Sequence, residues 1–232
     1  MVYQLKFVGH LEKEKILKIN IPKKLSIKTI IVSYIVFLSG WTFRVFCIDL
    51  SALNEYVSWT IGFLIHFVWW LLFAFFFIKR YDEDLKISFK EMVTTKPKLK
   101  MLLLLFVFAV AYNIGVFFLN SKGFGTTMKL YDLIITVLSV GIFEESVFRG
   151  WFLNAIAHFT SERKANLISS ALFVLIHYPT WISHGYGVVA ILCNSIAIYG
   201  LGLIFGWIFR KNKSIWTGAI FHSFWDLITF II

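Results

Sequence analysis

One uncharged apolar stretch decides the fold of this chain: Met101-Leu-Leu-Leu-Leu-Phe-Val-Phe-Ala-Val-Ala-Tyr-Asn-Ile-Gly-Val-Phe-Phe-Leu119. Its length matches the roughly 20 apolar residues that a helix needs to cross the hydrocarbon core of a bilayer. Because the stretch is continuously apolar and lacks the polar alternation of barrel strands, it indicates a transmembrane helix. Six further apolar segments are predicted at about 27–50, 57–78, 130–158, 164–183, 186–209 and 215–232. The sequence therefore predicts an all-α, polytopic transmembrane helix bundle with about seven spans.

The composition of the whole chain agrees with a membrane protein. Of its 232 residues, 59% are hydrophobic and 16% are charged, against about 25% charged in ordinary soluble domains. This balance excludes a soluble enzyme, a disordered chain, a coiled coil and a disulfide scaffold, and both cysteines, Cys47 and Cys193, lie in apolar runs. The net charge of +10 is expected to face membrane lipids rather than nucleic acid, because Lys and Arg of membrane proteins collect in cytoplasmic loops.

The distribution of Lys and Arg predicts the orientation. If the spans alternate, the segment through Lys28 holds 7 basic residues, the loop 79–100 holds 7, the loop around residue 163 holds 2 and the loop 210–213 holds 3, so 19 of the 23 share one side. The opposite side holds only Lys122 and Lys129. The positive-inside rule then predicts a multi-pass cell-membrane protein with a cytoplasmic N-terminus and an extracellular C-terminus. The first 26 residues lack a cleavable signal peptide and are expected to be a basic cytoplasmic segment.

The middle of the fourth segment carries three charged residues, in Gly141-Ile-Phe-Glu-Glu-Ser-Val-Phe-Arg-Gly150. Each costs at least about 2.5–3.5 kcal/mol at the centre of a membrane helix. Glu145 and Arg149 are four residues apart and within reach of an ion pair, which fits a structural role as well as a chemical one. Glu144 points about 100° away, and helix rise places it near the midplane. One arginine therefore leaves Glu144 as the uncompensated carboxylate.

Two more polar pairs occur in the following segments. Phe173 and His177 share one face of the fifth, and His222 and Asp226 share one face of the seventh, both by i,i+4 spacing. Helix rise puts these pairs between the midplane and the cytoplasmic half. We therefore expect them to meet Glu144 in a single polar cavity, where a carboxylate can act as base and then acid and an imidazole can orient water or donate to developing charge.

These residues resemble the motifs of the CPBP family of intramembrane proteases, the CAAX protease and bacteriocin-processing or Abi-like family, with a Rce1-like catalytic core. The matching patterns are Glu-Glu-x-x-x-Arg at 144–149, Phe-x-x-x-His at 173–177 and His-x-x-x-Asp at 222–226. The glycines of Gly202-x-x-x-Gly206 also resemble the third region of the family, and we expect them to pack internally. The resemblance covers about residues 128–230, the last four spans, and does not extend to the first three. The chain is therefore expected to consist of a basic segment at 1–26, accessory helices 1–3 at 27–127 and a four-helix catalytic core at 128–232.

The resemblance also implies roles. Glu144 and His177 would polarise the attacking water, Glu145 and Arg149 would hold the site in register, and His222 with residue 226 would stabilise the oxyanion. Many family members carry Asn in the last motif, and Asp226 can donate a hydrogen bond only when protonated, so it alternatively orients His222 or binds a metal.

The motifs leave metal dependence open. The His-Glu-x-x-His pattern of zinc proteases is missing, so no cofactor is assured and metal-independent water activation is favoured. Zinc nevertheless has a potential ligand set in Glu144, His177 and His222, with Asp226 as a fourth.

The resulting expectation is an intramembrane endopeptidase that cuts a membrane-associated peptide or protein entering from the cytoplasmic side. Processing of a bacteriocin or signalling peptide, or self-immunity to one, is the expected biological setting. The alternative is a non-catalytic membrane scaffold or bacteriocin immunity protein that keeps the helices without the chemistry. A transporter ranks lowest, because no inverted repeat is visible.

Overall fold

The computed structural model describes residues 24–120 and 133–231. Most of the basic segment expected over 1–26 lies outside this range. So do Lys122 and Lys129, which were assigned to the extracellular side.

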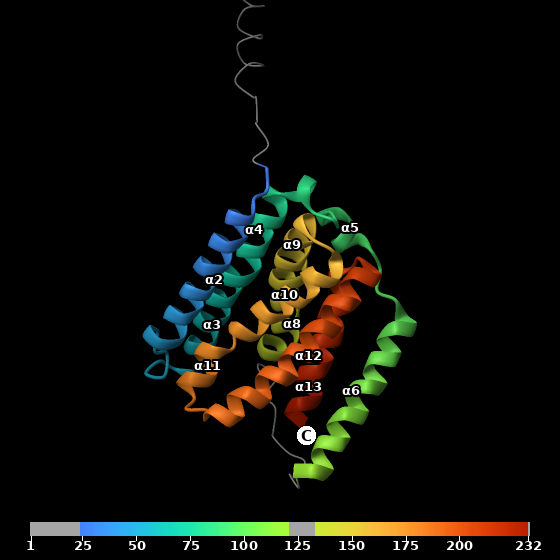
Figure 1. Ribbon diagram of the computed structural model, residues 1–232. Coiled ribbons are helices and arrows are strands. Elements are labelled where there is room, and N and C mark those ends of the chain that lie inside the picture. Colours follow the sequence, from blue (N-terminus) through green and yellow to red (C-terminus); the bar gives the residue numbers. More distant parts are fainter. Residues whose placement is uncertain (1–23, 121–132, 232) are drawn as a thin grey trace, which may run out of the picture.

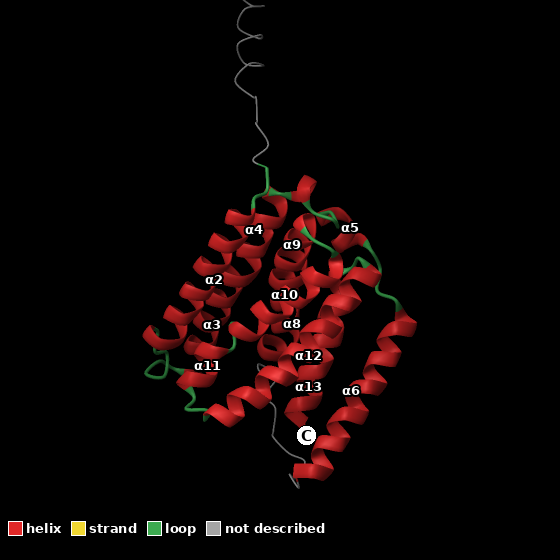
Figure 2. Ribbon diagram, in the orientation of Figure 1, coloured by secondary structure: helices red, strands yellow, loops and turns green. Residues whose placement is uncertain are grey.

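All secondary structure in the described residues is helical, as Figure 2 shows, so the all-α prediction is confirmed. The helices form seven successive stretches. They are α2 (Ile27–Cys47); α3 (Glu55–His66), η1 (Phe67–Leu72) and α4 (Phe73–Arg80); α6 (Leu99–Asn120); η3 (Leu133–Ser139), α8 (Val140–Glu145), η4 (Ser146–Leu153) and α9 (Asn154–Phe159); α10 (Glu162–Leu175) and α11 (Tyr178–Ser183); α12 (Val188–Asn212); and α13 (Ile215–Ile231). Two short helices, η2 (Asp82–Asp84) and α5 (Phe89–Thr94), lie in the connection between α4 and α6.

The stretches alternate in direction across the bundle (Figure 1). The start of α2 and the connections 81–98, 160–161 and 213–214 lie at one end, and the connections 48–54 and 184–187 lie at the other with the end of α13. The predicted gathering of Lys and Arg on one side of the membrane requires such an alternation. Within the described residues, five stretches are long and apolar enough to cross a membrane: 27–47, 55–80, 99–118, 162–183 and 188–212. Of the other two, 133–159 contains three charged residues near its middle and α13 is described over only 17 residues.

The boundaries of several helices have identifiable local causes. The side chain of Ser26 accepts the backbone N–H of Thr29 at the start of α2, and Ser161 does the same for Lys164 at the start of α10. Such N-caps satisfy donors that the first helical turn cannot pair. At its C-terminal end, α12 stops where Lys213 adopts a left-handed conformation with φ of 54°.

The fifth segment differs from its prediction as one continuous helix over 164–183. Helix α10 ends at Leu175, and α11 begins at Tyr178 with Pro179 in its first turn. Proline has no N–H to donate to the carbonyl four residues back, which belongs to Leu175, and its ring crowds that carbonyl. The break places His177 at the corner between two helices.

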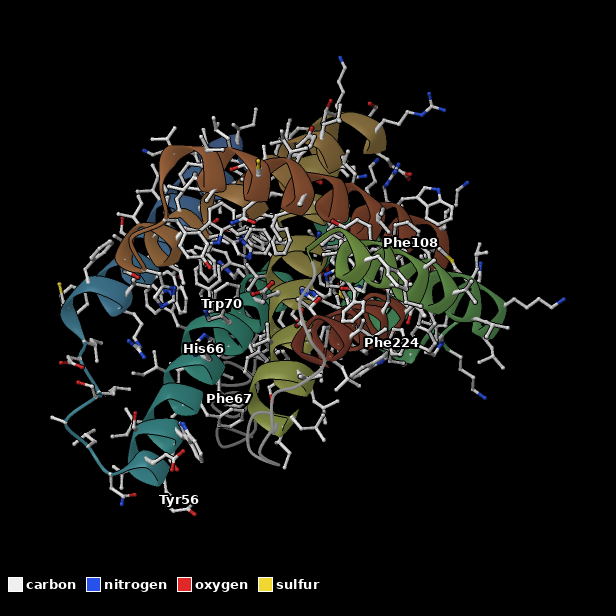
Figure 3. The ribbon with its side chains drawn as sticks, turned by 90° about the horizontal axis from the view of Figure 1, so that it is seen from below. Tyr56, His66, Phe67, Trp70, Phe108 and Phe224 are labelled. Carbon is white, nitrogen blue, oxygen red and sulfur yellow. The ribbon has the colours of Figure 1, made fainter. Side chains whose placement is uncertain are left out.

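Two apolar cores flank the centre of the bundle. The first is rich in aromatic rings from α2, η1, α4 and η4, including Phe37, Trp70 and Phe148. The second joins α6, α12 and α13. Figure 3 views the bundle from below and shows Trp70 on η1, and Phe108 and Phe224 on the neighbouring helices α6 and α13. The charged residues singled out from the sequence lie on α8, η4 and α13, which pack with α10 and α12.

Glycines bring these central helices close together. A Cβ atom on Gly141 would lie 2.7 Å from the Ser223 hydroxyl of α13, and one on Gly202 would lie 3.0 Å from the Ser170 Cβ of α10. A Cβ on Gly206 would overlap Asn166. Lipid supplies no hydrophobic drive for helix association, so such close packing is a main source of stability. The expectation that Gly202 and Gly206 pack internally is confirmed.

Candidate active site

The predicted ion pair of Glu145 and Arg149 lies in the interior of the bundle. Glu145 Oε1 is 3.0 Å from Arg149 Nη1, and both side chains are at most 2% exposed. The Arg149 Nη2 donates to the carbonyl of Gly202 at 3.1 Å. Its guanidinium carbon lies 4.5 Å from the ring centroid of Phe173 and 5.0 Å from that of Phe205. A carboxylate, a carbonyl and two ring faces therefore stabilise the buried guanidinium.

His222 joins three carboxylates. Its Nδ1 is 3.3 Å from Glu145 Oε1, and its Nε2 is 3.6 Å from Glu144 Oε2 and 3.9 Å from Asp226 Oδ2. The carboxylate that the arginine leaves uncompensated thus faces an imidazole from α13. The side chains of Glu144 and Asp226 are 14% and 23% exposed, against 8% for His222 and 1% for Glu145. Glu144 and Asp226 therefore form the accessible side of the cluster.

His177 reaches the same region from the corner between α10 and α11. Its Nδ1 lies 2.7 Å from the carbonyl oxygen of Phe173. Because a carbonyl only accepts, this contact assigns the Nδ1 proton in the neutral ring and leaves Nε2 as an acceptor. The Phe173 ring meets both imidazoles edge-on, with centroid distances of 5.0 Å to His177 and 6.2 Å to His222.

All six residues singled out from the sequence lie on three of the helical stretches, 133–159, 162–183 and 215–231. Two of the predicted pairs, Glu145–Arg149 and His222–Asp226, are in direct contact, each at i,i+4 spacing. Glu144 contacts His222 rather than Arg149. His177 is connected to the others through Phe173. The arrangement combines a carboxylate, an acceptor nitrogen and a donor in a membrane interior, which are the groups that acid–base hydrolysis requires.

Residues 126–228 match the family model described as type II CAAX prenyl endopeptidase Rce1-like. This part of the chain is an Rce1-like domain. The Rce1-like model is one of the CPBP family, and the match supports the general class of CAAX-type intramembrane protease. Searches of the curated proteins and of the solved structures found no match.

The Rce1-like domain does not present a ready-made metal site. Among the described residues, no group of three or more His, Cys, Asp or Glu side chains is arranged to hold a metal ion. Zinc ligands converge on a point about 2.0–2.3 Å from each donor atom. The conditional ligand set of Glu144, His177 and His222 does not fit that requirement as it stands, so the reaction proposed below has no step through a metal.

Several features of this site were not predicted from the sequence. Phe205 stacks on the His222 ring, with centroids 4.5 Å apart and planes at 22°. Gly218 leaves room for the carboxylate of Glu145, which would lie 2.8 Å from a Cβ at that position. Pro179 was a readable signal for the corner at His177. Phe205 carried no signal, because one phenylalanine among 26 in apolar helices does not stand out.

Proposed function

We propose that this protein is an intramembrane endopeptidase that hydrolyses a peptide bond with water activated by Glu144 and His177. The observation that carries the proposal is the convergence on His222 of Glu144, Glu145 and Asp226, all within 3.9 Å of a ring nitrogen. Three carboxylates and an imidazole cost too much in a membrane interior to be explained by packing alone.

The first step is attack of water on the scissile carbonyl. Glu144 is the accessible carboxylate on α8 and takes a proton from the water as its oxygen bonds to the carbonyl carbon. The free Nε2 of His177 accepts the second hydrogen of the same water and orients it. The tetrahedral intermediate then collapses: the C–N bond breaks, and Glu144 returns its proton to the leaving nitrogen.

The negative oxygen of the intermediate needs a donor. His222 Nε2 faces the space next to Glu144 and is suited to donate to that oxygen. Asp226, 3.9 Å from the same nitrogen, acts as its orienter. Glu145 and Arg149 hold His222 from the buried side, through Nδ1, and take no part in bond making.

The substrate class follows from the location of the site within membrane helices. A membrane-associated peptide or protein must bring an extended segment into the bundle, and we propose that it enters from the cytoplasmic side, where the Lys- and Arg-rich connections lie. Leader removal from a bacteriocin or signalling peptide, or self-immunity to such a peptide, is the proposed setting.

The experiment compares peptides released by cells that express the wild-type chain, Glu144→Gln, His177→Ala or Glu83→Gln. Glu83 is an exposed acidic residue far along the chain from the site and serves as the matched carboxylate control. We expect both site variants to insert and accumulate but to lose the processed peptide, while Glu83→Gln retains it. Full processing by both site variants would overturn the protease reading and favour the scaffold or immunity protein.

A further inference from the structure

Phe205 of α12 contacts two side chains of the site, His222 and Arg149. Its ring stacks on His222 with centroids 4.5 Å apart and planes at 22°. The guanidinium carbon of Arg149 lies 5.0 Å from the same ring centroid. Phe205 is 1% exposed, so it contacts no substrate and belongs to the supporting structure of the site.

The stacking restricts the orientation of the imidazole. A histidine ring bound only through its Cα–Cβ and Cβ–Cγ bonds can turn about the second of these over a broad range. Turning the ring out of its plane would move Nδ1 away from Glu145 and Nε2 away from Glu144. With Phe205 flat against it, the ring keeps Nδ1 at 3.3 Å from Glu145 and Nε2 at 3.6 Å from Glu144.

The ring of Phe205 is itself held in place. It is 1% exposed and packs in the second apolar core. The chain beside it is fixed as well, because the carbonyl of Gly202 accepts from Arg149 and Gly206 packs against Asn166. A rigid helix segment thus presents the ring to His222.

We propose that Phe205 is a positioning residue that sets the plane of the His222 ring and thereby keeps its two nitrogens directed at Glu145 and Glu144. The proposal rests on the proposed function only for its consequence, because the position of His222 matters for hydrolysis only if the protein is a protease. The packing claim itself applies whether or not a peptide is cut.

The matched control is Phe221. It is also a fully buried phenylalanine, 0% exposed, in the same core. Its described ring contacts are with Phe205 and Trp225, not with His222 or Arg149. Phe221→Leu therefore removes the same number of atoms from the same core without removing the ring that stacks on the imidazole.

The first readout is the proton NMR spectrum of labelled histidine rings in the full chain in detergent, with His222 assigned from its loss in His222→Gln. A proton over the face of an aromatic ring is shielded, so Phe205→Leu is expected to move the His222 ring resonances downfield. Phe221→Leu and Phe205→Tyr, which keep the stacking ring, are expected to leave them in place. If Phe205→Leu does not accumulate, Phe205→Met replaces it, because it is closer in volume.

The second readout is turnover of a quenched-fluorescent library of transmembrane peptides by reconstituted protein. Phe205→Leu is expected to lower kcat by about 10- to 100-fold with little change in KM, because misplacing a reacting group by about 1 Å has an effect of this size. Phe205→Tyr is expected to restore kcat, and Phe221→Leu to lower the melting temperature with kcat retained.

His222 resonances that are unchanged in Phe205→Leu would overturn the proposal. Equal losses of kcat in Phe205→Leu and Phe221→Leu would also overturn it, since both would then reflect core stability. If Glu144→Gln keeps full turnover, the proposed function fails separately, and the NMR comparison alone decides the role of Phe205.

Discussion

At the scale of single residues, the interior of this protein tolerates charge because every charged group has a specific partner. Arg149 is surrounded by Glu145, the Gly202 carbonyl and two aromatic rings. Glu145 is shared between Arg149 and His222. The second carboxylate, Glu144, lies 3.6 Å from the His222 imidazole and is more exposed than Glu145. This difference between neighbouring residues separates a supporting pair from a reactive group.

Breaking the supporting pair is expected to destabilise the protein. Either Glu145→Gln or Arg149→Leu leaves an uncompensated buried partner, at a cost of about 3–5 kcal/mol. The double variant Glu145→Leu/Arg149→Leu should recover part of this loss, because it removes both charges together. The measurement is the melting temperature in detergent.

The control for this prediction is the ion pair between Lys213 and Glu91, which has the same 3.0 Å separation but side chains that are 56% and 37% exposed. Glu91→Gln is expected to cost at most about 1 kcal/mol. Equal melting temperatures for Glu145→Gln and Glu91→Gln would show that burial adds nothing to the pair of Glu145 and Arg149.

At the scale of helices, the site depends on the contact between α8 and α13. These two helices carry Glu144, Glu145, His222 and Asp226, and they meet where Gly141 faces α13 and Gly218 faces Glu145. The side-chain distances in the cluster follow from that close approach. Widening the contact by one methyl group should therefore affect the chemistry as well as the packing.

Gly141→Ala tests this contact. The added Cβ would lie 2.7 Å from the Ser223 hydroxyl and 2.8 Å from the Ala219 carbonyl oxygen, which is backbone and cannot move away alone. Overpacking of this kind costs about 1–3 kcal/mol. We expect a lower melting temperature together with loss of peptide processing, measured on the same preparations.

Gly200→Ala is the matched control, because a Cβ at that position in α12 meets nothing within 4 Å. Alanine is also the better helix former by about 1 kcal/mol, so the melting temperature should stay the same or rise. A Gly141→Ala protein that melts and cuts like Gly200→Ala would contradict the tight α8–α13 contact.

Helix positions could largely be read from the sequence, because in a membrane apolar length determines where helices lie. Segments predicted at 101–119 and 215–232 correspond to α6 and α13. The turns with wider π-helical hydrogen bonding, such as η4, had no sequence signal, since they depend on how neighbouring helices pack. The corner at His177 did have a sequence signal, because Pro179 cannot donate a hydrogen bond to the carbonyl of Leu175.

At the scale of the whole molecule, contacts within one helix could be predicted and contacts between helices could not. The spacing of Glu145 and Arg149 was sufficient to predict their ion pair, because both lie on one helix. The contact of Glu144 with His222 and the stacking of Phe205 join different helices. Such contacts depend on the crossing of helices, which the spacing within one segment does not determine.

The orientation of the bundle is a further prediction. Single cysteines at Ser51→Cys and Lys96→Cys, with Cys47 and Cys193 changed to Ser, mark the two ends of the bundle at exposed positions. A membrane-impermeant maleimide should label Ser51→Cys on intact cells and Lys96→Cys only after lysis, because the positive-inside rule predicts that the Lys-rich end is cytoplasmic. The reverse pattern would contradict the orientation and the proposed side of substrate entry.

The central claim is that a water activated by Glu144 hydrolyses a peptide bond. The most direct measurement is mass spectrometry of products formed by the reconstituted protein from the transmembrane peptide library in ¹⁸O-labelled water. The account predicts one labelled oxygen in the new carboxyl terminus of each product from the wild-type chain and from Glu83→Gln, and no product from Glu144→Gln. Labelled product from Glu144→Gln at the wild-type rate would contradict it.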